Sequence, residues 1–568
     1  MKLVIAEKPS VAISIAKVIG ATKKKYGYYE GNRYKVSWCV GHLIQMANPE
    51  SYDEKYAKWN MADLPIIPRE YKYEIAKSTK KQFMILKKLM NDKDIDTVIN
   101  ACDAGREGEA IFRLVYNQAN CKKKMKRLWI SSMEDSAIKE GFDNLKDGSF
   151  YDNLFESSQA RAIADWLVGM NLSRLYSCLY KQNYSVGRVQ TPTLAMIVKR
   201  DDEIANFKKE KYYTVELSFN GFTLSTDRID DEVTAEQLLN LVGDKIEITD
   251  VIQKKKITKP DLPFDLTTLQ RECNKYFGYS AKQTLDYAQS LYEKKLITYP
   301  RTDSRFLTED MIVSTVNNIL GKNDFDTGRI KTVFNSKKVT DHHAIIPTES
   351  SMNEDLTSLP ESELKVYELI LNKLHASVGY PLIENAMKIV AEFDSFTFTS
   401  SGKTIKDEGF TKYLKEYKSK KNEDMALPDV NIGDVLSIEN KEIKEKYTQP
   451  AKHFTEDLLL KAMELAGNDA LEKGVEIERK GLGTPATRAG IIENLIFKGF
   501  VERDKKNLIA THKGISLVTI VADTFKSTET TAKWEMELSD IAQGKSSKGN
   551  FLEAIENEIK EVVSTYIK

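Results

Sequence analysis

The sequence predicts a multidomain α/β protein that combines an N-terminal parallel sheet, two helical units and β-rich stretches. Apolar runs at residues 2–6 (KLVIA) and 97–102 (TVINAC) each precede an acidic turn and a helical pattern, as buried parallel strands do. A helix–helix–strand pattern at residues 266–304 occurs again near the end of the chain. Residues 211–260 and 382–448 alternate as short strands do. The 568 residues allow roughly three to five domains.

The composition is that of a folded protein without a membrane segment. Hydrophobic residues make up 41% and charged residues 30%, which excludes a disordered chain. No apolar run approaches the roughly 20 residues of a membrane helix, and Glu7, Lys8 and Pro9 interrupt the first apolar stretch too early for a secretion signal. The five cysteines form no CxxC pair, which argues against a zinc ribbon and fits reduced thiols. We therefore expect a cytoplasmic protein.

The total charge does not decide whether the protein binds nucleic acid. The chain has 84 basic and 84 acidic side chains, whereas DNA-binding proteins usually carry a basic excess. Basic runs occur at residues 23–25, 122–127 and 254–256, but each run alone is typical of a solvated face.

Acidic residues follow both predicted strands of the N-terminal part. Glu7 comes after the first strand, and Asp103 and Glu107 come after the second. Ligands of parallel α/β sheets bind at the carboxyl ends of the strands, so these three carboxylates could converge on one crevice. Carboxylate oxygens suit Mg²⁺. Solvated loop acids explain the pattern equally well.

Residues 291–304, LYEKKLITYPRTDS, place a tyrosine near an arginine at a rigid corner. Residues 296–299 alternate as a short strand would, and Pro300 ends that strand before Arg301. The hydroxyl of Tyr299 beside a guanidinium could attack a phosphorus atom, because the cation offsets charge on the phosphate oxygens. The alternative is a half-buried strand tyrosine with a surface arginine, and for these two residues alone it is the better explanation.

Two polar pairs lie in the helical stretch that follows residue 150. Arg161 and Asp165 are four residues apart and share a helix face, which alone indicates a surface ion pair. In SVGRVQT, small residues let a backbone approach closely, while Arg188 and Gln190 offer donors to a phosphate or a base edge.

The second helix–helix–strand unit comprises residues 456–466, residues 486–498 and the strand–turn–strand GFVERDKKNLIATHKG. Both units are winged-helix-like, and such units commonly bind DNA. Simple helical packing modules are the alternative. Thr484 precedes Pro485 as a helix cap. Thr484, Thr487 and Arg488 could therefore hold a DNA phosphate at a helix N-terminus.

Seven strings carry a resemblance to one known family. They are EKPS (7–10), DAGREGE (103–109), SVGRVQTPTL (185–194), LITYPRTDS (296–304), DHHAIIPT (341–348), GLGTPATRAGII (481–492) and TAKWEMELSDIAQGK (531–545). In this order they resemble the type IA DNA topoisomerases, and the last three look most like bacterial topoisomerase III. The resemblance covers nearly the whole chain.

The resemblance implies an α/β multidomain toroid. Residues 1–150 would form a Toprim α/β domain, residues 151–208 and 450–568 a helical DNA-groove domain, residues 209–262 and 382–449 a β-rich arch, and residues 263–381 a winged-helix-like domain with the nucleophilic tyrosine. One position departs from the family: the usual DxDxE reads Asp103, Gly105, Glu107 here, so one metal ligand is missing.

The resemblance also implies an ATP-independent enzyme that cleaves one DNA strand through a 5′-phosphotyrosine at Tyr299, passes a strand and reseals the break. It would thereby relax negative supercoils and decatenate DNA. Catalysis would depend on Tyr299, Glu7, Lys8, Arg301 and His342, and Mg²⁺ would be held by Glu7, Asp103 and Glu107. No GxxxxGK[ST] loop occurs, which fits ATP independence.

The resemblance places Arg161, Asp165, Arg188 and Gln190 in a groove for single-stranded DNA. We expect a monomer that acts on single-stranded and negatively supercoiled DNA, with a helicase as a candidate partner. Two other functions use the same features: a Toprim nuclease or primase-like enzyme would need Asp103 and Glu107 but not Tyr299. A non-catalytic single-strand DNA-binding protein would need only the groove and the winged helices.

Overall fold

The computed structural model describes residues 1–321, 325–339, 342–417, 426–467 and 481–566. Asp341, the first residue of the DHHAIIPT string, lies outside these ranges. No helix in these ranges is long and apolar enough to cross a membrane.

The N-terminal part is a seven-stranded sheet with helices on both faces. The strand order is β2-β3-β4-β1-β7-β8-β9. The central strands β4 (Tyr34–Trp38), β1 (Lys2–Ala6), β7 (Thr97–Ala101) and β8 (Lys124–Arg127) are parallel. Antiparallel strands β2 (Lys23–Lys25), β3 (Tyr28–Gly31) and β9 (Lys146–Asp147) flank them. The two apolar runs at residues 2–6 and 97–102 thus form neighbouring strands, and both predictions are confirmed.

The two faces of this sheet belong to separate cores because side chains alternate along each strand. Val4 and Ala6 pack with α1 (Pro9–Val18) and α4 (Asp135–Asp143). Leu3 and Ile5 pack with α2 (Lys80–Met90) and α3 (Arg106–Gln118) on the other face. Strands covered on both faces are apolar throughout, which explains the continuous run KLVIA.

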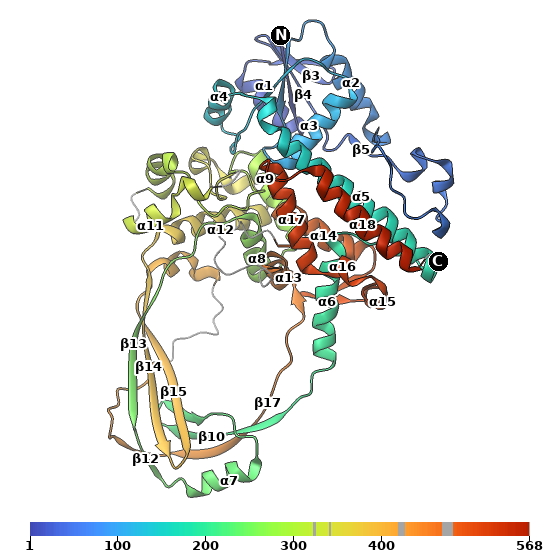
Figure 1. Ribbon diagram of the computed structural model, residues 1–568. Coiled ribbons are helices and arrows are strands. Elements are labelled where there is room, and N and C mark those ends of the chain that lie inside the picture. Colours follow the sequence, from blue (N-terminus) through green and yellow to red (C-terminus); the bar gives the residue numbers. More distant parts are fainter. Residues whose placement is uncertain (322–324, 340–341, 418–425, 468–480, 567–568) are drawn as a thin grey trace.

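The helical part combines segments from two distant regions of the chain. It contains α5 (Asp152–Tyr180), α6 (Gln190–Ala205), α13 (Glu456–Leu465), α14 (Pro485–Phe497), α15 (His512–Ile520), α16 (Asp523–Lys526), α17 (Thr528–Ala542) and α18 (Lys548–Tyr566). A small sheet orders β18 (Phe454–Thr455), β20 (Asn507–Ala510) and β19 (Val501–Asp504). One apolar core joins α5 and α6 to the later helices, and α17 and α18 lie along α5 (Figure 1).

The two β-rich stretches of the sequence form one antiparallel sheet. Its order is β13 (Asp250–Thr258), β14 (Leu382–Phe393), β15 (Phe396–Asp407), β11 (Phe222–Thr226), β10 (Lys211–Phe219) and β17 (Asn440–Tyr447). The helix α7 (Glu232–Leu241) covers one face, and β12 (Lys245–Glu247) pairs with β16 (Val435–Ser437).

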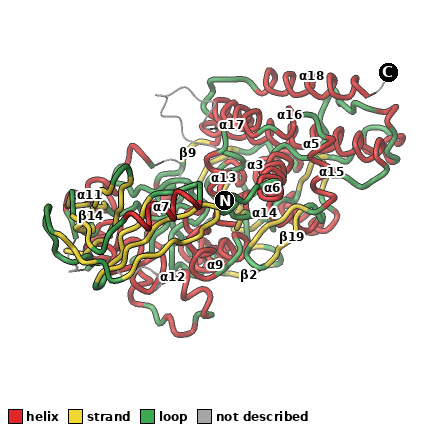
Figure 2. The backbone as a smooth tube through the Cα atoms, turned by 90° about the horizontal axis from the view of Figure 1, so that it is seen from below, coloured by secondary structure: helices red, strands yellow, loops and turns green. Residues whose placement is uncertain are grey.

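The six-stranded sheet lies apart from the rest of the molecule and is joined to it by two arms. The ends of β13, β14 and β15 form one arm, and α6 with the ends of β10 and β17 forms the other. The chain therefore outlines a ring (Figure 1). Seen from below, α5, α6 and α15 lie on one side of the molecule, whereas β14 and α11 (Thr327–Val333) lie on the other (Figure 2).

The part that carries Tyr299, the tyrosine part, contains α8 (Leu266–Phe277), α9 (Ala281–Glu293) and α12 (Glu361–Val378). The strand predicted for residues 296–299 is wrong: the segment has only an isolated bridge between Ile297 and Pro347. Its backbone amides bond different segments, because Thr298 donates to Ile346 and Tyr299 donates to Ser131. The segment is therefore extended but belongs to no sheet. The second unit matches its prediction, with α13, α14 and the β19–β20 hairpin.

An apolar core connects the tyrosine part to the N-terminal sheet. It includes Val4 and Ala6 of β1 together with Leu291, Ile297 and Tyr299. The two parts are therefore held in contact by burial as well as by polar groups.

The helix α8 begins with a buried aspartate. Asp265 is 4% exposed, and its carboxylate accepts from the Thr268 amide and from the Thr268 hydroxyl, both at 2.7 Å. Burial raises the pKa of Asp265 to about 6, with a smaller contribution from Glu464. The charged form is thus less favourable in the folded protein than in the unfolded chain, where an aspartate has a pKa of about 3.9.

We predict that Asp265→Asn stabilises the protein at pH 7.5, by up to about 3 kcal/mol. A folded-state pKa above the unfolded value means that stability falls as the pH rises from about 4 to 6. Asparagine keeps the cap acceptor without the charge. The gain should therefore shrink when thermal unfolding is measured near pH 4.

Asp231→Asn is the matched control. Asp231 caps α7 with the same contact to an amide, that of Thr234 at 2.9 Å, but it is exposed and this hydrogen bonding lowers its pKa. Its replacement should give no gain at pH 7.5. Equal effects of the two substitutions would contradict the assignment of a buried, destabilising charge at Asp265.

Candidate active site

The carboxyl ends of β1 and β7 place two acidic residues side by side. Because β1 pairs with β7, the residues that follow them, Glu7 and Asp103, are neighbours, and the Asp103 amide donates to Glu7 Oε2 at 3.3 Å. Glu7 is 4% exposed. Burial first, and then the charge of Asp103, raise the pKa of Glu7 to about 7, although Lys8 and Arg301 act in the opposite direction.

Tyr299 contacts this acidic pair from the other side. Its hydroxyl donates to Asp103 Oδ2 at 3.2 Å, and its ring lies 4.5 Å from that of His342 and 5.3 Å from that of Tyr292. Burial raises the pKa of Tyr299 well above its usual value, and the charge of Asp103 adds to the effect. The phenol is therefore protonated in this closed arrangement.

Arg301 and Glu107 form the exposed edge of the site. Arg301 Nη1 lies 3.2 Å from Glu107 Oε2, and His42 Nε2 lies 3.8 Å from Glu107 Oε1. The nearby His42 ring lowers the pKa of Glu107, although burial opposes it, and the charge of Arg301 lowers it further. The sequence analysis missed His42. Its position just after β4, the other neighbour of β1, was the signal that could have found it.

His342 connects the tyrosine part to the N-terminal part. Its Nε2 lies 2.7 Å from the Ala104 carbonyl, which can only accept, so Nε2 carries the proton. Its Nδ1 then accepts from the Ser131 hydroxyl at 2.8 Å. Burial lowers the pKa of His342, so the ring is neutral. The ring also stacks on Trp129, at 6.1 Å. Sequence reasoning missed Ser131 and Trp129, and no local pattern marks them.

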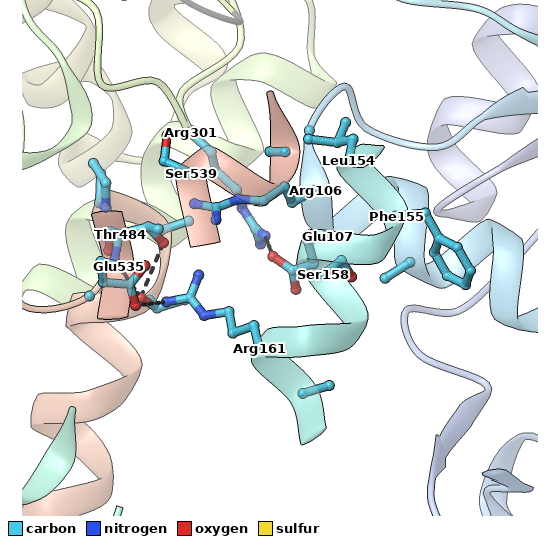
Figure 3. A pocket seen from close by; sticks show the side chains of 18 of the residues that line it. Arg106, Glu107, Leu154, Phe155, Ser158, Arg161, Arg301, Thr484, Glu535 and Ser539 are labelled. Carbon is cyan, nitrogen blue, oxygen red and sulfur yellow. Dashed lines mark hydrogen bonds and ion pairs between the residues drawn. The ribbon is translucent and has the colours of Figure 1, made fainter. Parts of the chain in front are cut away.

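Of these groups, Tyr299, Arg301, His342 and Glu107 line a cavity of about 690 Å³ between three parts of the molecule. The N-terminal part, the tyrosine part and the helical part all contribute to its wall. The candidate residues that line it are Glu107, Arg161, Asp165, Tyr299, Arg301, His342, Thr484, Thr487 and Arg488. Figure 3 shows Arg161, Glu107 and Arg301 around the same space.

The predicted groove residues divide into two groups. Arg161 and Asp165 line the cavity, whereas Arg188 and Gln190 do not. Arg188 is 2% exposed and contacts Asp165 Oδ1 at 2.8 Å. Gln190 is 8% exposed and accepts from Asn494 at 3.0 Å. Arg188 therefore holds the wall residue Asp165 from behind, whereas Gln190 contacts residues outside the wall.

The helix N-terminus at α14 has its own internal contacts. The Thr487 hydroxyl lies 3.1 Å from that of Thr484, in a capping box. Arg488 is 2% exposed and donates to the Leu482 carbonyl and to the Thr267 hydroxyl. Burial lowers the pKa of Arg488. Thr484 and Thr487 are therefore more accessible from the cavity than Arg488 is.

Lys8 lies away from the centre of the site. Its Nζ is 3.5 Å from Glu293 Oε1, and the Ser10 hydroxyl donates to the other oxygen of Glu293. Glu293 ends α9, the helix that leads to Tyr299. The pair therefore bridges the N-terminal part and the tyrosine part.

Glu7 and Asp103 are the carboxylates placed to hold a divalent ion. Within the described ranges, no group of three His, Cys, Asp or Glu side chains lies close enough to hold a metal. Glu107 is turned toward His42 and Arg301, which leaves Glu7 and Asp103 as adjacent donors. Mg²⁺ usually binds through one or two carboxylates with several waters, so this pair fits the ion.

Comparison with known proteins identifies both the N-terminal part and the rest of the chain. The sequence profile of the Toprim domain, a type that generally binds divalent metal, matches residues 2–133, and that of the family described as DNA topoisomerase matches residues 149–553. DNA topoisomerase 3 of Bacillus licheniformis is 40% identical over 591 residues, which cover 99% of this chain and 81% of the relative. That of Bacillus subtilis is 39% identical over 580 residues, with 97% and 80% covered.

A solved structure has the same fold. Full-length topoisomerase I from Thermotoga maritima superimposes with a TM-score of 0.77 at 25% identity, covering 99% of this chain and 90% of that one. The profile, the relatives and the structure agree along nearly the whole sequence. The chain belongs to the type IA DNA topoisomerases.

Proposed function

We propose that Tyr299 cleaves one strand of DNA by attack on a phosphodiester, that a second strand then passes, and that the break is resealed. The observation that carries this proposal is the contact of the Tyr299 hydroxyl with Asp103, beside Glu7 and Arg301, at the wall of one cavity. A strand lying in this cavity would meet the nucleophile and the cation at the wall, with Asp103 and Glu7 directly behind the tyrosine.

In the proposed step, Tyr299 Oη forms a bond to phosphorus while the bond from phosphorus to the 3′ oxygen breaks. The phenol proton passes to Asp103, the group to which the hydroxyl already donates. The 3′ oxygen leaves with a proton from Glu7, whose pKa of about 7 leaves a substantial fraction of it protonated near neutral pH. Arg301 offsets charge on the phosphate oxygens. The products are a 5′-phosphotyrosine and a 3′ hydroxyl.

Lys8 and His342 have supporting roles in this scheme. To reach the phosphate, Lys8 would have to leave Glu293, which it contacts at 3.5 Å. His342 holds its ring against Tyr299 through its bonds to Ser131 and Ala104, so it orients the nucleophile.

We assign Asp103 and Glu7 as the main holders of Mg²⁺ once Glu7 has given up its proton, with Glu107 as a third ligand after it releases His42. The ion would neutralise this acidic crevice and the phosphate of a DNA end. Resealing brings an end with its own negative charge back to the acids, so we expect it to need the ion more than cleavage does.

Strand passage requires the tyrosine part to separate from the N-terminal part. The contacts that join them across the site include Tyr299 to Ser131 and Asp103, His342 to Ala104 and Ser131, and Arg301 to Glu107. The two arms of the ring supply the connection that persists while these contacts open. We infer that the ring is the toroid of the family and that its parts follow the four divisions expected from the sequence. We also infer the groove for single-stranded DNA and the relaxation and decatenation activities.

We predict that Tyr299→Phe abolishes the covalent adduct with a single-stranded oligonucleotide and changes oligonucleotide affinity by less than about threefold. The phenol is the only proposed nucleophile, and phenylalanine retains its packing. Denaturing gels and fluorescence anisotropy measure the two quantities. Tyr292→Phe, a buried tyrosine 5.3 Å away, is the matched control and should still form the adduct. An adduct formed by the Tyr299 variant would disprove the scheme.

Arg301→Lys is expected to lower the cleavage rate at saturating oligonucleotide by about tenfold or more. A guanidinium can bridge two phosphate oxygens in a plane, whereas an ammonium is a point charge. Single-turnover adduct formation measures this rate. Arg69→Lys, at a residue outside the cavity wall, serves as the control. A rate equal to that of the parent would reduce Arg301 to an ordinary surface charge.

Gly105 is the position where the family places an additional aspartate. It precedes α3 at φ 147°, where side chains are strained, although a Cβ would meet nothing within 4 Å. We predict that Gly105→Asp and Gly105→Ala lower the melting temperature alike, because the cost comes from the backbone.

The same two variants distinguish the role of Gly105 in the turn from the effect of the missing carboxylate on metal binding. If the missing carboxylate is what makes the ion weakly held, Gly105→Asp alone should relax DNA at lower Mg²⁺ than the parent. Titration of relaxation against Mg²⁺, with Gly105→Ala alongside, measures the midpoint. Identical midpoints for all three proteins would remove the metal argument and leave Gly105 as a turn residue only.

A further inference from the structure

A buried carboxylate on α17 faces the cavity. Glu535 is 1% exposed, and its Oε1 accepts from Arg161 Nη2 at 3.0 Å and from Arg188 Nη1 at 2.8 Å. The two arginines come from α5 and from the turn before α6, far from α17 in the sequence. Figure 3 shows Glu535 and Arg161 meeting at the cavity wall.

The two arginines bound by Glu535 have different surroundings. The Arg188 side chain is fully buried, and its Nε donates to Asp165. The Arg161 side chain is 19% exposed and lines the cavity. Arg188 is thus a fixed support, whereas Arg161 is the arginine that a bound molecule can touch.

The helix α17 also fixes the backbone of this support. Thr531 lies one turn before Glu535, and its hydroxyl donates to the Arg188 carbonyl at 3.0 Å. The Ser157 hydroxyl of α5 donates to the Leu538 carbonyl of α17 at 2.5 Å. The position of Glu535 relative to α5 and Arg188 is therefore set by contacts on both sides.

Glu535 is ionised at neutral pH. Burial alone would raise its pKa, but the charges of Arg161, Arg188 and Arg106 lower the pKa of Glu535 to about 2. A buried carboxylate with such partners is costly to remove, because the cations would remain without it. Glu535 is the carboxylate that Arg161 and Arg188 share, and Asp165 is a second carboxylate on Arg188.

We propose that Glu535 is a positioning residue that holds Arg161 in the cavity wall, so that a phosphate of the bound strand meets a guanidinium already in place. A guanidinium has five N–H donors, and the contact with Glu535 uses one of them. Arg161 can then bind a phosphate without leaving Glu535. This proposal rests on the proposed function, in which the strand lies in this cavity.

The test is Glu535→Gln, studied at saturating oligonucleotide. We expect the single-turnover rate of adduct formation to fall about tenfold or more, because small displacements of a positioning group strongly affect rate. We expect the affinity for single strands to stay within about threefold or to tighten, because one negative charge leaves the cavity wall. Glu529→Gln, at an exposed residue of the same helix, should match the parent.

A double-mutant cycle separates positioning from general structure. If Glu535 acts through Arg161, the double variant Arg161→Gln/Glu535→Gln should cleave no more slowly than Arg161→Gln alone. Losses that multiply would overturn the proposal. A merely structural role would lower the melting temperature of Glu535→Gln and leave its saturated rate unchanged, which would also overturn it.

Glu535→Asp covers the case in which Glu535→Gln does not fold. Aspartate keeps the charge that Arg188 needs but is one methylene shorter, so we expect a folded protein with a reduced saturated rate. A parental rate would overturn the proposal. Absence of an adduct in the parent protein would instead disprove the proposed function, so the two failures are distinguishable.

Discussion

The adjacent carboxylates at the ends of β1 and β7 are the constraint on which the rest of the site depends. The parallel pairing of these strands brings Asp103 beside the buried Glu7, where the charge of Asp103 and the burial raise the energetic cost of ionising Glu7. The groups around them reduce that cost in different ways. Tyr299 donates a hydrogen bond, Arg301 supplies a positive charge, and a divalent ion would supply two.

The closed site is shared between parts of the molecule that must come apart. Tyr299 and His342 are held by Ser131 and Ala104, which belong to the N-terminal part. Separation would also expose apolar residues of the core that the two parts share. Polar contacts and apolar burial thus both favour closure, which keeps the reacting ends of a cleaved strand near one another.

Local sequence patterns predicted the elements, but not the contacts between them. The strands at residues 2–6 and 97–102 and the helices α8, α9, α13 and α14 follow from periodicity and caps. The strand at Tyr299 was wrong because its amides bond two separate segments, and Lys295 before it has a positive φ of 65°. Ser131 and Glu535 have roles that arise only from tertiary pairing, and no spacing in the sequence reveals them. The family resemblance, not composition or charge, identified the tyrosine and its neighbours.

The core shared by α5, α6 and the later helices has a consequence for synthesis. The residues of the six-stranded sheet and of the tyrosine part lie between these two groups in the sequence. While the chain leaves the ribosome, α5 and α6 therefore expose apolar faces until α13 to α18 have also been made. Such delayed, long-range burial slows folding and leaves an interval in which nascent chains can associate wrongly. A chaperone that covers apolar helices during this interval would favour the native protein.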